Sequence, residues 1–182
     1  MNGQIDALRA YLKRGGVIAY PTESCYGLGC DPRNVRALER LIRLKGRSAA
    51  KGLLLVADHV KRLNAFIRLL NADDRARMRR SWPGPVSWVV PASAACPPLL
   101  TGGRATIAIR VTAHPCAARL CRSLGMALVS TSANKSGKKP AQTAAECRRI
   151  FGEQVRVIDG RIGQRRRPST LIDLATGTVL RP

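Results

Sequence analysis

Residues 106–139, TIAIRVTAHPCAARLCRSLGMALVSTSANKSGKK, decide the fold class of this chain. Within this stretch the run Thr106–Arg110 predicts a β-strand, and the apolar spacing from Pro115 to Ser123 predicts a helix. The run Ala127–Ser130 predicts a second strand, which the hydroxyl-rich loop Thr131–Lys139 follows. A strand, a helix and a strand in succession are typical of α/β proteins.

The same alternation extends over the rest of the chain in both directions. An N-terminal helical pattern ends at Gly15-Gly16, and Thr143 with Glu146 forms a capping box that starts a helix over Ala144–Phe151. A turn at Thr176-Gly177 joins the last two strands as a hairpin, which favours a mixed sheet. A chain of 182 residues is typical of one domain, here 1–182. The other predicted elements are a helix near 35–42, helical pieces over 59–80, and strands at Val17–Tyr20, Leu53–Val56, Val86–Val90, Val155–Ile158, Thr170–Asp173 and Thr178–Leu180.

The composition indicates a polyanionic partner. Lys and Arg number 32 against 11 Asp and Glu, which gives a net charge of +21, and 25 of the basic residues are Arg. Arginine forks onto phosphates and carboxylates, so RNA or nucleotide phosphates are the expected partners. The alternative is that much of the Arg is solvated surface. The longest apolar runs are of strand length, so we expect no membrane span and a cytoplasmic protein.

The sequence argues against several common kinds of site. Its six cysteines include no C-x-x-C pair, and we expect free thiols and no metal site. No P-loop motif is present. Gly27-Leu28-Gly29 begins like a dinucleotide fingerprint, but Pro32 stands where the third glycine would allow close packing.

Three polar clusters remain as candidates for a site, each at the end of a predicted element. They are Tyr20–Ser24 after a strand, Lys45-Gly46-Arg47 with Lys51-Gly52 at the end of a helix, and Ser130–Gly137 after a strand. Small hydroxyl residues can close around a phosphate or carboxylate, and ligands of open α/β sheets bind beyond strand ends. The alternatives are plain polar turns and cations that only complement the helix dipole, which would contribute little to stability. If the clusters converge, they form a site for electrostatic positioning of a substrate.

Several short motifs follow one another along the chain: Tyr20-Pro21-Thr22-Glu23, Lys45-Gly46-Arg47, Lys51-Gly52, Trp82-Pro83-Gly84-Pro85, Ile107–Val111, His114-Pro115, Ser130–Asn134 and Pro168–Asp173. Together, and in this order, they resemble the YrdC/TsaC family. The resemblance implies a twisted, open α/β sandwich with a mixed sheet and a concave, basic face. Ser48 departs from the family, which usually has proline there, and this affects loop geometry more than the ligands.

The same resemblance implies an activity and a set of site residues. Members of the family join L-threonine, bicarbonate or CO2, and ATP with Mg²⁺ into threonylcarbamoyl-AMP and pyrophosphate, and a partner complex then transfers the threonylcarbamoyl group to tRNA. By motif, Lys45 and Arg47 are the expected catalytic pair. The expected ATP-binding set is Lys45, Arg47, Lys51, Ser132, Asn134 and Arg181, and the expected threonine-binding set is Thr22, Arg110, Ser130 and Ser169.

Two alternatives stay open at the level of sequence. The first is an RNA-binding protein on the same fold that forms no adenylate, for which the net charge of +21 is the support. Few aromatic residues lie near basic clusters, which is unfavourable for base stacking. The second is the same class of enzyme with a different substrate.

Overall fold

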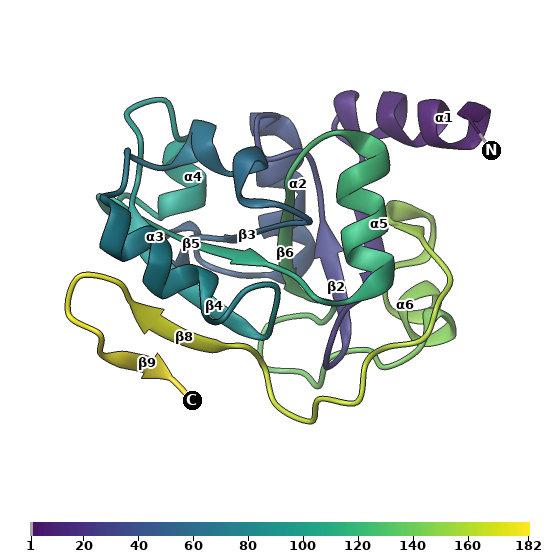
Figure 1. Ribbon diagram of the computed structural model, residues 1–182. Helices are drawn as coiled ribbons and strands as arrows, with labels where there is room; N and C mark the ends of the chain where they lie inside the picture. The colour runs from purple at the N-terminus through teal and green to yellow at the C-terminus, as the bar shows by residue number, and fades with distance from the viewer. Residues whose placement is uncertain (1) are drawn as a thin grey trace.

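A computed structural model describes residues 2–182 and confirms the mixed α/β fold class (Figure 1). Within these residues nine strands form one sheet, in the order β7-β1-β2-β6-β3-β5-β4-β8-β9. Three neighbouring pairs, β1/β7, β3/β5 and β4/β8, are parallel, and the other neighbours are antiparallel. The strands are β1 (Ile18–Pro21), β2 (Tyr26–Gly29), β3 (Leu54–Ala57), β4 (Val86–Pro91), β5 (Thr106–Val111), β6 (Leu128–Ser132), β7 (Arg156–Val157), β8 (Thr170–Asp173) and β9 (Val179–Arg181).

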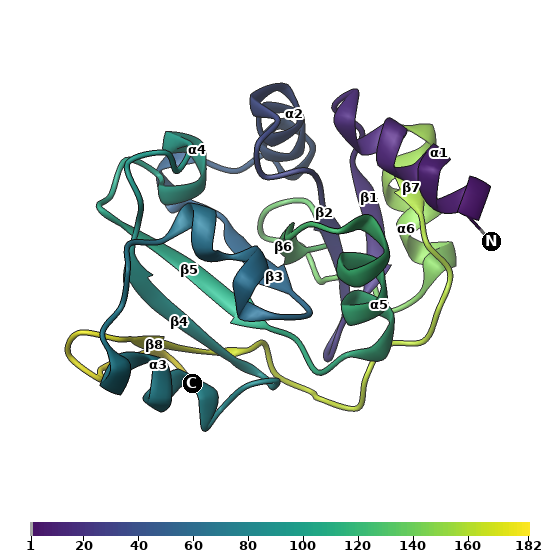
Figure 2. The same ribbon diagram turned by 45° about the horizontal axis from the view of Figure 1, so that its top comes forward.

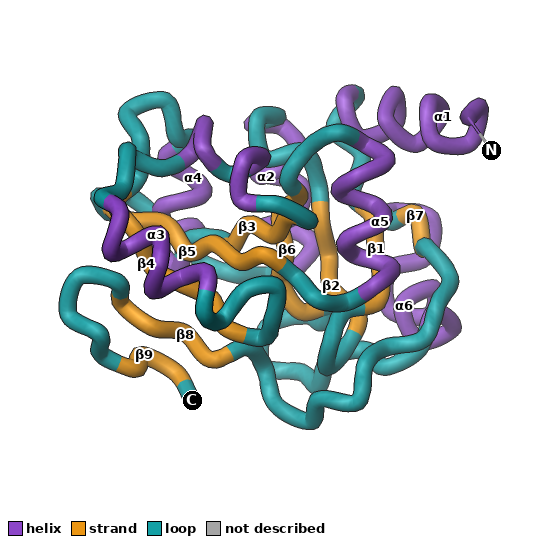
Figure 3. The backbone as a smooth tube through the Cα atoms, viewed as in Figure 1, coloured by secondary structure: helices purple, strands orange, loops and turns teal. Residues whose placement is uncertain are grey.

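Helices pack on both faces of this sheet (Figures 1 and 3). Helices α1 and α5 pack against each other, and α5 also packs on β1 and β3. Strand β8 lies at the far end of the molecule from α1 (Figure 2), where it forms a hairpin with β9 (Figure 1). The helices are α1 (Asn2–Lys13), α2 (Val35–Lys45), α3 (Ala72–Arg79), α4 (Pro98–Thr101), α5 (Pro115–Leu124) and α6 (Ala144–Phe151), with short 3-10 turns at Ala49–Lys51, Val60–Arg62, Asn64–Phe66 and Gly152–Gln154.

Alternation along the strands divides the core into two layers. In β1, Ile18 and Tyr20 join the cluster beneath α1 and α5, whereas Ala19 faces the larger cluster on the opposite side. In β3, Val56 joins the cluster beneath α1 and α5, and Leu55 joins the larger cluster. Successive side chains of a strand point to opposite faces, so strands covered on both sides are apolar at nearly every position. This explains why β1, β3 and β6 were predictable from short apolar runs.

Local signals placed most elements correctly. Thr143 accepts a hydrogen bond from the Glu146 amide at 3.1 Å and starts α6 as the capping box predicts. The second half of the box differs, because the Glu146 carboxylate accepts from the Gln142 amide instead of the Thr143 amide. Gly46, with φ +57°, ends α2 in the left-handed conformation that glycine adopts readily.

Strand β2 is the main element that was not predicted. Its Gly27 and Gly29 weaken the strand signal, yet Gly29 is needed because a Cβ there would lie 2.6 Å from the Val129 carbonyl and 2.7 Å from the Tyr20 ring. Pairing with β2 also extends β6 through Thr131 and Ser132, which the sequence assigned to a loop. The short helix α4 was missed as well. Strand β7 covers only Arg156–Val157, and β9 lies one residue later than expected.

No helix among residues 2–182 combines the length and apolar character that crossing a membrane would require.

Candidate active site

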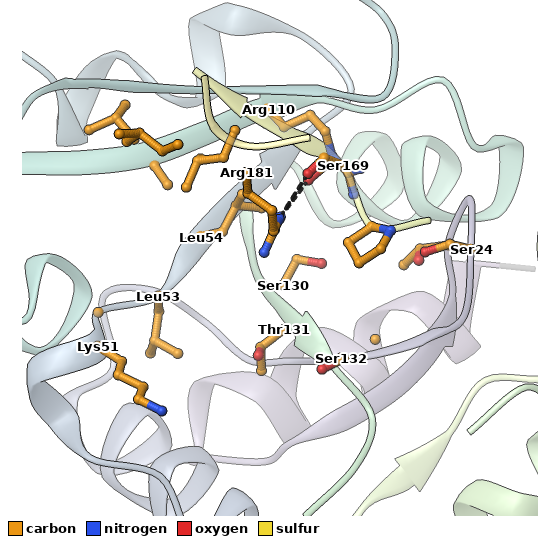
Figure 4. Close-up of a pocket in the computed structure, with 18 of the residues that line it drawn as sticks. Ser24, Lys51, Leu53, Leu54, Arg110, Ser130, Thr131, Ser132, Ser169 and Arg181 are labelled. Carbon is orange, nitrogen blue, oxygen red and sulfur yellow. Dashed lines mark hydrogen bonds between the residues drawn. The ribbon is translucent and has the colours of Figure 1, made fainter. Parts of the chain in front are cut away.

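A cavity of about 780 Å³ lies on one face of the sheet, and strand β5 forms part of its floor (Figure 4). Thr106, Ala108 and Arg110 line the cavity, whereas the intervening Ile107 and Ile109 belong to the core on the other face. Leu54 of β3 lines the cavity and also packs against the cluster beneath α1 and α5. The cavity therefore begins where the helical cover of this face ends.

Eight of the ten site residues expected from the sequence line this cavity, although they come from distant parts of the chain. Ser130, Thr131 and Ser132 lie along β6, with Lys51 on one side and Arg110 and Arg181 on the other (Figure 4). The expected residues that line the cavity are Thr22, Arg47, Lys51, Arg110, Ser130, Ser132, Ser169 and Arg181. The two that do not line it are Lys45 and Asn134.

Lys45 is buried behind the cavity wall and holds the Ser132–Asn134 segment in place. The residue is 4% exposed, and Nζ lies 3.1 Å from the Asn134 carbonyl and 2.9 Å from Asn134 Oδ1. Nζ also donates to the Ser132 carbonyl, and Ser132 Oγ donates to Asn134 Oδ1 at 2.7 Å. Burial, together with the neighbouring positive charge of Arg47, lowers the pKa of Lys45 to about 8. The alternative of a cation that only complements the helix dipole therefore does not describe Lys45, although Lys45 lies behind the cavity wall and not on it.

Positive charge is concentrated on the cavity wall. Six cationic side chains line it, and Asp173 is the one acidic residue among the described lining residues. Burial lowers the pKa of Arg47, and the charges of Arg104 and Arg181 lower it further. The guanidinium groups stay protonated nonetheless, so the wall attracts an anion of several charges. The six are Arg47, Lys51, Arg104, Arg110, Arg166 and Arg181.

Two of these cations, Arg104 and Arg166, were not expected from the sequence. Arg104 is brought to the cavity because the turn before it packs closely against the 49–52 segment, with Gly102 facing Gly52. A Cβ on Gly102 would lie 2.4 Å from the Ala50 carbonyl and 2.7 Å from the Gly52 amide. Because both positions are glycine, the turn that carries Arg104 lies directly against the 49–52 segment. Arg104 then donates to the carbonyls of Ala50 at 2.7 Å and Lys51 at 3.1 Å. The Gly102-Gly103 pair indicates a turn or a close contact in the sequence, but the sequence does not show which segment lies against it.

Hydroxyl groups line the other end of the cavity beside Arg110. The Thr22 hydroxyl donates to the Cys25 carbonyl at 2.7 Å, which leaves its oxygen able to accept. Ser169 Oγ accepts from Ser87 Oγ at 2.8 Å and from Arg181 Nη2 at 3.1 Å. At Gly27 a Cβ would lie 3.2 Å from Thr22 Cγ2 and 3.4 Å from Ser130 Oγ, so the glycine keeps space open between these groups.

The fold and the cavity define an α/β protein whose site combines a cationic wall with a recess of hydroxyl groups beside Arg110. The comparisons agree with this class. A family model named Sua5/YciO/YrdC, described as "Telomere recombination", matches residues 10–182. The chain belongs to this family.

Relatives and solved structures cover almost the entire chain. A protein of Thiobacillus denitrificans named threonylcarbamoyl-AMP synthase is 74% identical over 98% of this chain and 95% of its own length. One of the same name from Methylobacillus flagellatus is 56% identical over 97% of this chain and 98% of its own. Sua5 of P. abyssi in complex with L-threonine has a TM-score of 0.91 at 30% identity, and the match covers 100% of this chain and 54% of that chain. This chain therefore spans just over half the length of that Sua5 protein.

Proposed function

We propose that this chain is a threonylcarbamoyl-AMP synthase, an adenylate-forming nucleotidyltransferase. The observation that carries the proposal is that a group of arginines and a recess lined by hydroxyls and Arg110 share one cavity. Relatives that carry this name at up to 74% identity support it. ATP, L-threonine and bicarbonate or CO2 are the substrates.

The reaction requires two bond-forming steps in one enclosed space. The threonine amine adds to CO2, which bicarbonate supplies by losing hydroxide, and gives an N-carboxylate with release of the amine proton. An oxygen of that carboxylate then attacks the α-phosphorus of ATP, and the bond to pyrophosphate breaks. Phosphoryl and nucleotidyl transfers of this kind depend mainly on positioning and on stabilisation of charge.

The residues divide between the two ends of the cavity. Arg47 and Lys51 contact the triphosphate from one side, and Arg181 reaches it from the side of Arg110 and Ser169. Their positive charge stabilises the leaving pyrophosphate. Arg110 binds the threonine carboxylate through its planar guanidinium. Lys45 and Asn134 act from behind the wall, because they fix the segment that presents Ser132. Thr22, Ser130 and Ser169 supply hydroxyls around the amino acid.

Mg²⁺ fits this site as a companion of the nucleotide and not as a resident metal. The described residues contain no group of three or more His, Cys, Asp or Glu side chains that could hold a metal ion, and Asp173 is the one carboxylate among the described lining residues. Mg²⁺ keeps several waters and is usually bound through substrate phosphates with one or two carboxylates. When bound, it would neutralise charge on the pyrophosphate.

The proposal includes a place in the cell and further partners. We place the protein in the cytoplasm, where it has access to ATP and tRNA. A tRNA-modifying transfer complex is the consumer of the adenylate, because a mixed anhydride of this kind is reactive and is not an end product. RNA affinity is a further proposal, supported by the net charge of +21.

Pyrophosphate release tests the activity directly. The purified protein is given ATP, Mg²⁺, L-threonine and bicarbonate, and each of these is omitted in turn. We expect release that depends on both threonine and bicarbonate. Release without threonine would indicate a different acceptor, and no release under any condition, from a folded protein that binds ATP, would favour the alternative of an RNA-binding protein without catalysis.

A further inference from the structure

Arg110 is the cavity-lining cation that is paired with a carboxylate. Glu23 Oε2 lies 3.2 Å from Arg110 Nη2, and both side chains are largely buried, at 14% and 7% exposed. Among the described residues, no other cavity-lining cation makes an ion pair. Glu23 itself does not line the cavity, so it contacts Arg110 from behind.

The Glu23 carboxylate is in turn held by the end of β5. Thr112 Oγ1 donates to Glu23 Oε1 at 2.7 Å and accepts the His114 amide at 3.1 Å. A hydroxyl has one hydrogen, so once its oxygen accepts from His114 that hydrogen is directed at Glu23. The Thr112 amide donates to the Ala57 carbonyl at 3.0 Å, which ties this arrangement to β3.

The pairing leaves both partners with unused hydrogen-bonding capacity. Arg110 Nε and Glu23 Oε2 are buried without a hydrogen-bond partner, so the guanidinium is oriented by charge and not by a hydrogen bond along its axis. A guanidinium has five N–H donors in a fixed plane, and it binds a carboxylate best when two of them face it side by side. Its orientation is thus as important for the site as its charge.

We infer that Glu23 is a positioning residue, which turns the Arg110 guanidinium so that its free edge receives the carboxylate of the amino-acid substrate. This rests on the proposed function only in taking an amino-acid carboxylate as the anion at Arg110. If Glu23 acted only through its negative charge, its removal would change the affinity for the substrate carboxylate in the opposite direction. A negative charge behind an anion site weakens binding of the anion, so removing the charge without disturbing Arg110 would strengthen it.

The experiment measures equilibrium binding of L-threonine and of L-threoninamide, in which a neutral amide replaces the carboxylate, by titration calorimetry. For Glu23→Gln we expect threonine affinity to fall by about tenfold or more, because a misoriented Arg110 loses one charge-assisted hydrogen bond to the threonine carboxylate. Threoninamide affinity and the KM for ATP are expected to stay unchanged. Thr112→Val is expected to give a smaller loss of the same kind, and Thr112→Ser, which keeps the hydroxyl, is expected to bind threonine normally.

A control is available at Asp58, the other buried carboxylate that pairs with arginine among the described residues. The Asp58 side chain is 7% exposed, lies 2.5 Å from Arg62 and 3.7 Å from Arg122, and does not line the cavity. Asp58→Asn therefore repeats the chemical change of Glu23→Gln elsewhere in the fold, and it is expected to leave threonine binding unchanged. If Glu23→Gln does not fold, the comparison of Thr112→Val with Thr112→Ser carries the test.

Tighter threonine binding by Glu23→Gln would overturn the inference, as would an equal loss for threonine and threoninamide. A wild-type protein that does not prefer threonine over the amide would overturn it too. Failure of the proposed function has a different signature, namely carboxylate-dependent threonine binding without pyrophosphate release.

Discussion

The ammonium group of Lys45 makes the candidate site depend on pH. Its pKa of about 8 lies far below that of any arginine, so the other charges of the wall persist while this one is lost. We expect the KM for ATP to rise as the pH increases through about 8, since one positive charge near the phosphates disappears. Pyrophosphate release at several ATP concentrations and pH values measures this. A KM for ATP that stays constant across that range would contradict the prediction.

Deprotonation of Lys45 is expected to weaken ATP binding but to favour the folded state. The folded pKa of Lys45 lies below its ordinary value of 10.5, so between about 8 and 10.5 the unfolded chain binds more protons than the folded one. The contribution of Lys45 to the free energy of unfolding therefore rises with pH over this window. We expect denaturant titrations of the wild type to show this slope relative to Lys45→Met, which cannot titrate. Parallel pH profiles of the two proteins would refute this assignment.

Arg47 lies on the wall and is expected to affect catalysis more than folding. Its Nη1 lies 3.4 Å from Thr131 Oγ1 and its Nη2 3.2 Å from the Lys51 carbonyl, both contacts near the limit for hydrogen bonds. We expect Arg47→Ala to reduce adenylate formation by about 10²–10³-fold, as for removal of one donor at a transition state. Arg43→Ala is the matched control, because Arg43 is in the last turn of α2, the helix that ends just before Arg47, and does not line the cavity. Equal rates of adenylate formation in the two variants would show that Arg47 has no role in catalysis.

At the scale of elements, the contact of the α4–β5 turn with the 49–52 segment can be tested by two neighbouring glycines. Gly102 has φ +63° and no room for a Cβ, whereas Gly103 has φ +81° and nothing within 4 Å of its Cβ position. Alanine at either position strains the backbone, but only Gly102→Ala forces the segments apart and displaces Arg104. We expect Gly102→Ala to raise the KM for ATP severalfold, beyond any change in Gly103→Ala. Identical kinetics in both variants would show that the contact has no role in the site.

Sequence patterns predicted the elements whose ends or periodicity depend on residues close by in the chain. The capping residue Thr143 and the left-handed Gly46 determine helix ends through neighbours a few residues away. Strand β2 was missed because its glycines are explained by Tyr20 and Val129, which contact them only in the folded sheet. The burial of Lys45 was missed for the same reason, because its partners in the Ser132–Asn134 segment are almost ninety residues away. Family motifs named Lys45 as a site residue, but they did not distinguish a group on the wall from one behind it.

At the scale of the whole molecule, the net charge of +21 predicts salt-sensitive RNA binding that is separable from catalysis. The structure selects Arg79 and Arg80 for this test, since both are exposed, lie in a basic run and do not line the cavity. We expect Arg79→Gln/Arg80→Gln to reduce the slope of log affinity against log salt by about 1 to 2 while adenylate formation is unchanged. Filter binding with an unmodified tRNA over a range of salt measures the slope. Wild-type binding that does not change with salt would exclude an electrostatic origin.

The position of Arg181 has a practical consequence for any fusion or label. Leu180 and Arg181 both line the cavity, and Arg181 donates to the Ser169 carbonyl at 2.9 Å. A peptide appended after Pro182 would start within a residue or two of this contact, and an acidic epitope there would compete with nucleotide for the arginines. Helix α1 lies at the opposite end of the molecule (Figure 1), so affinity handles, fluorophores and surface-immobilisation chemistry belong on that side.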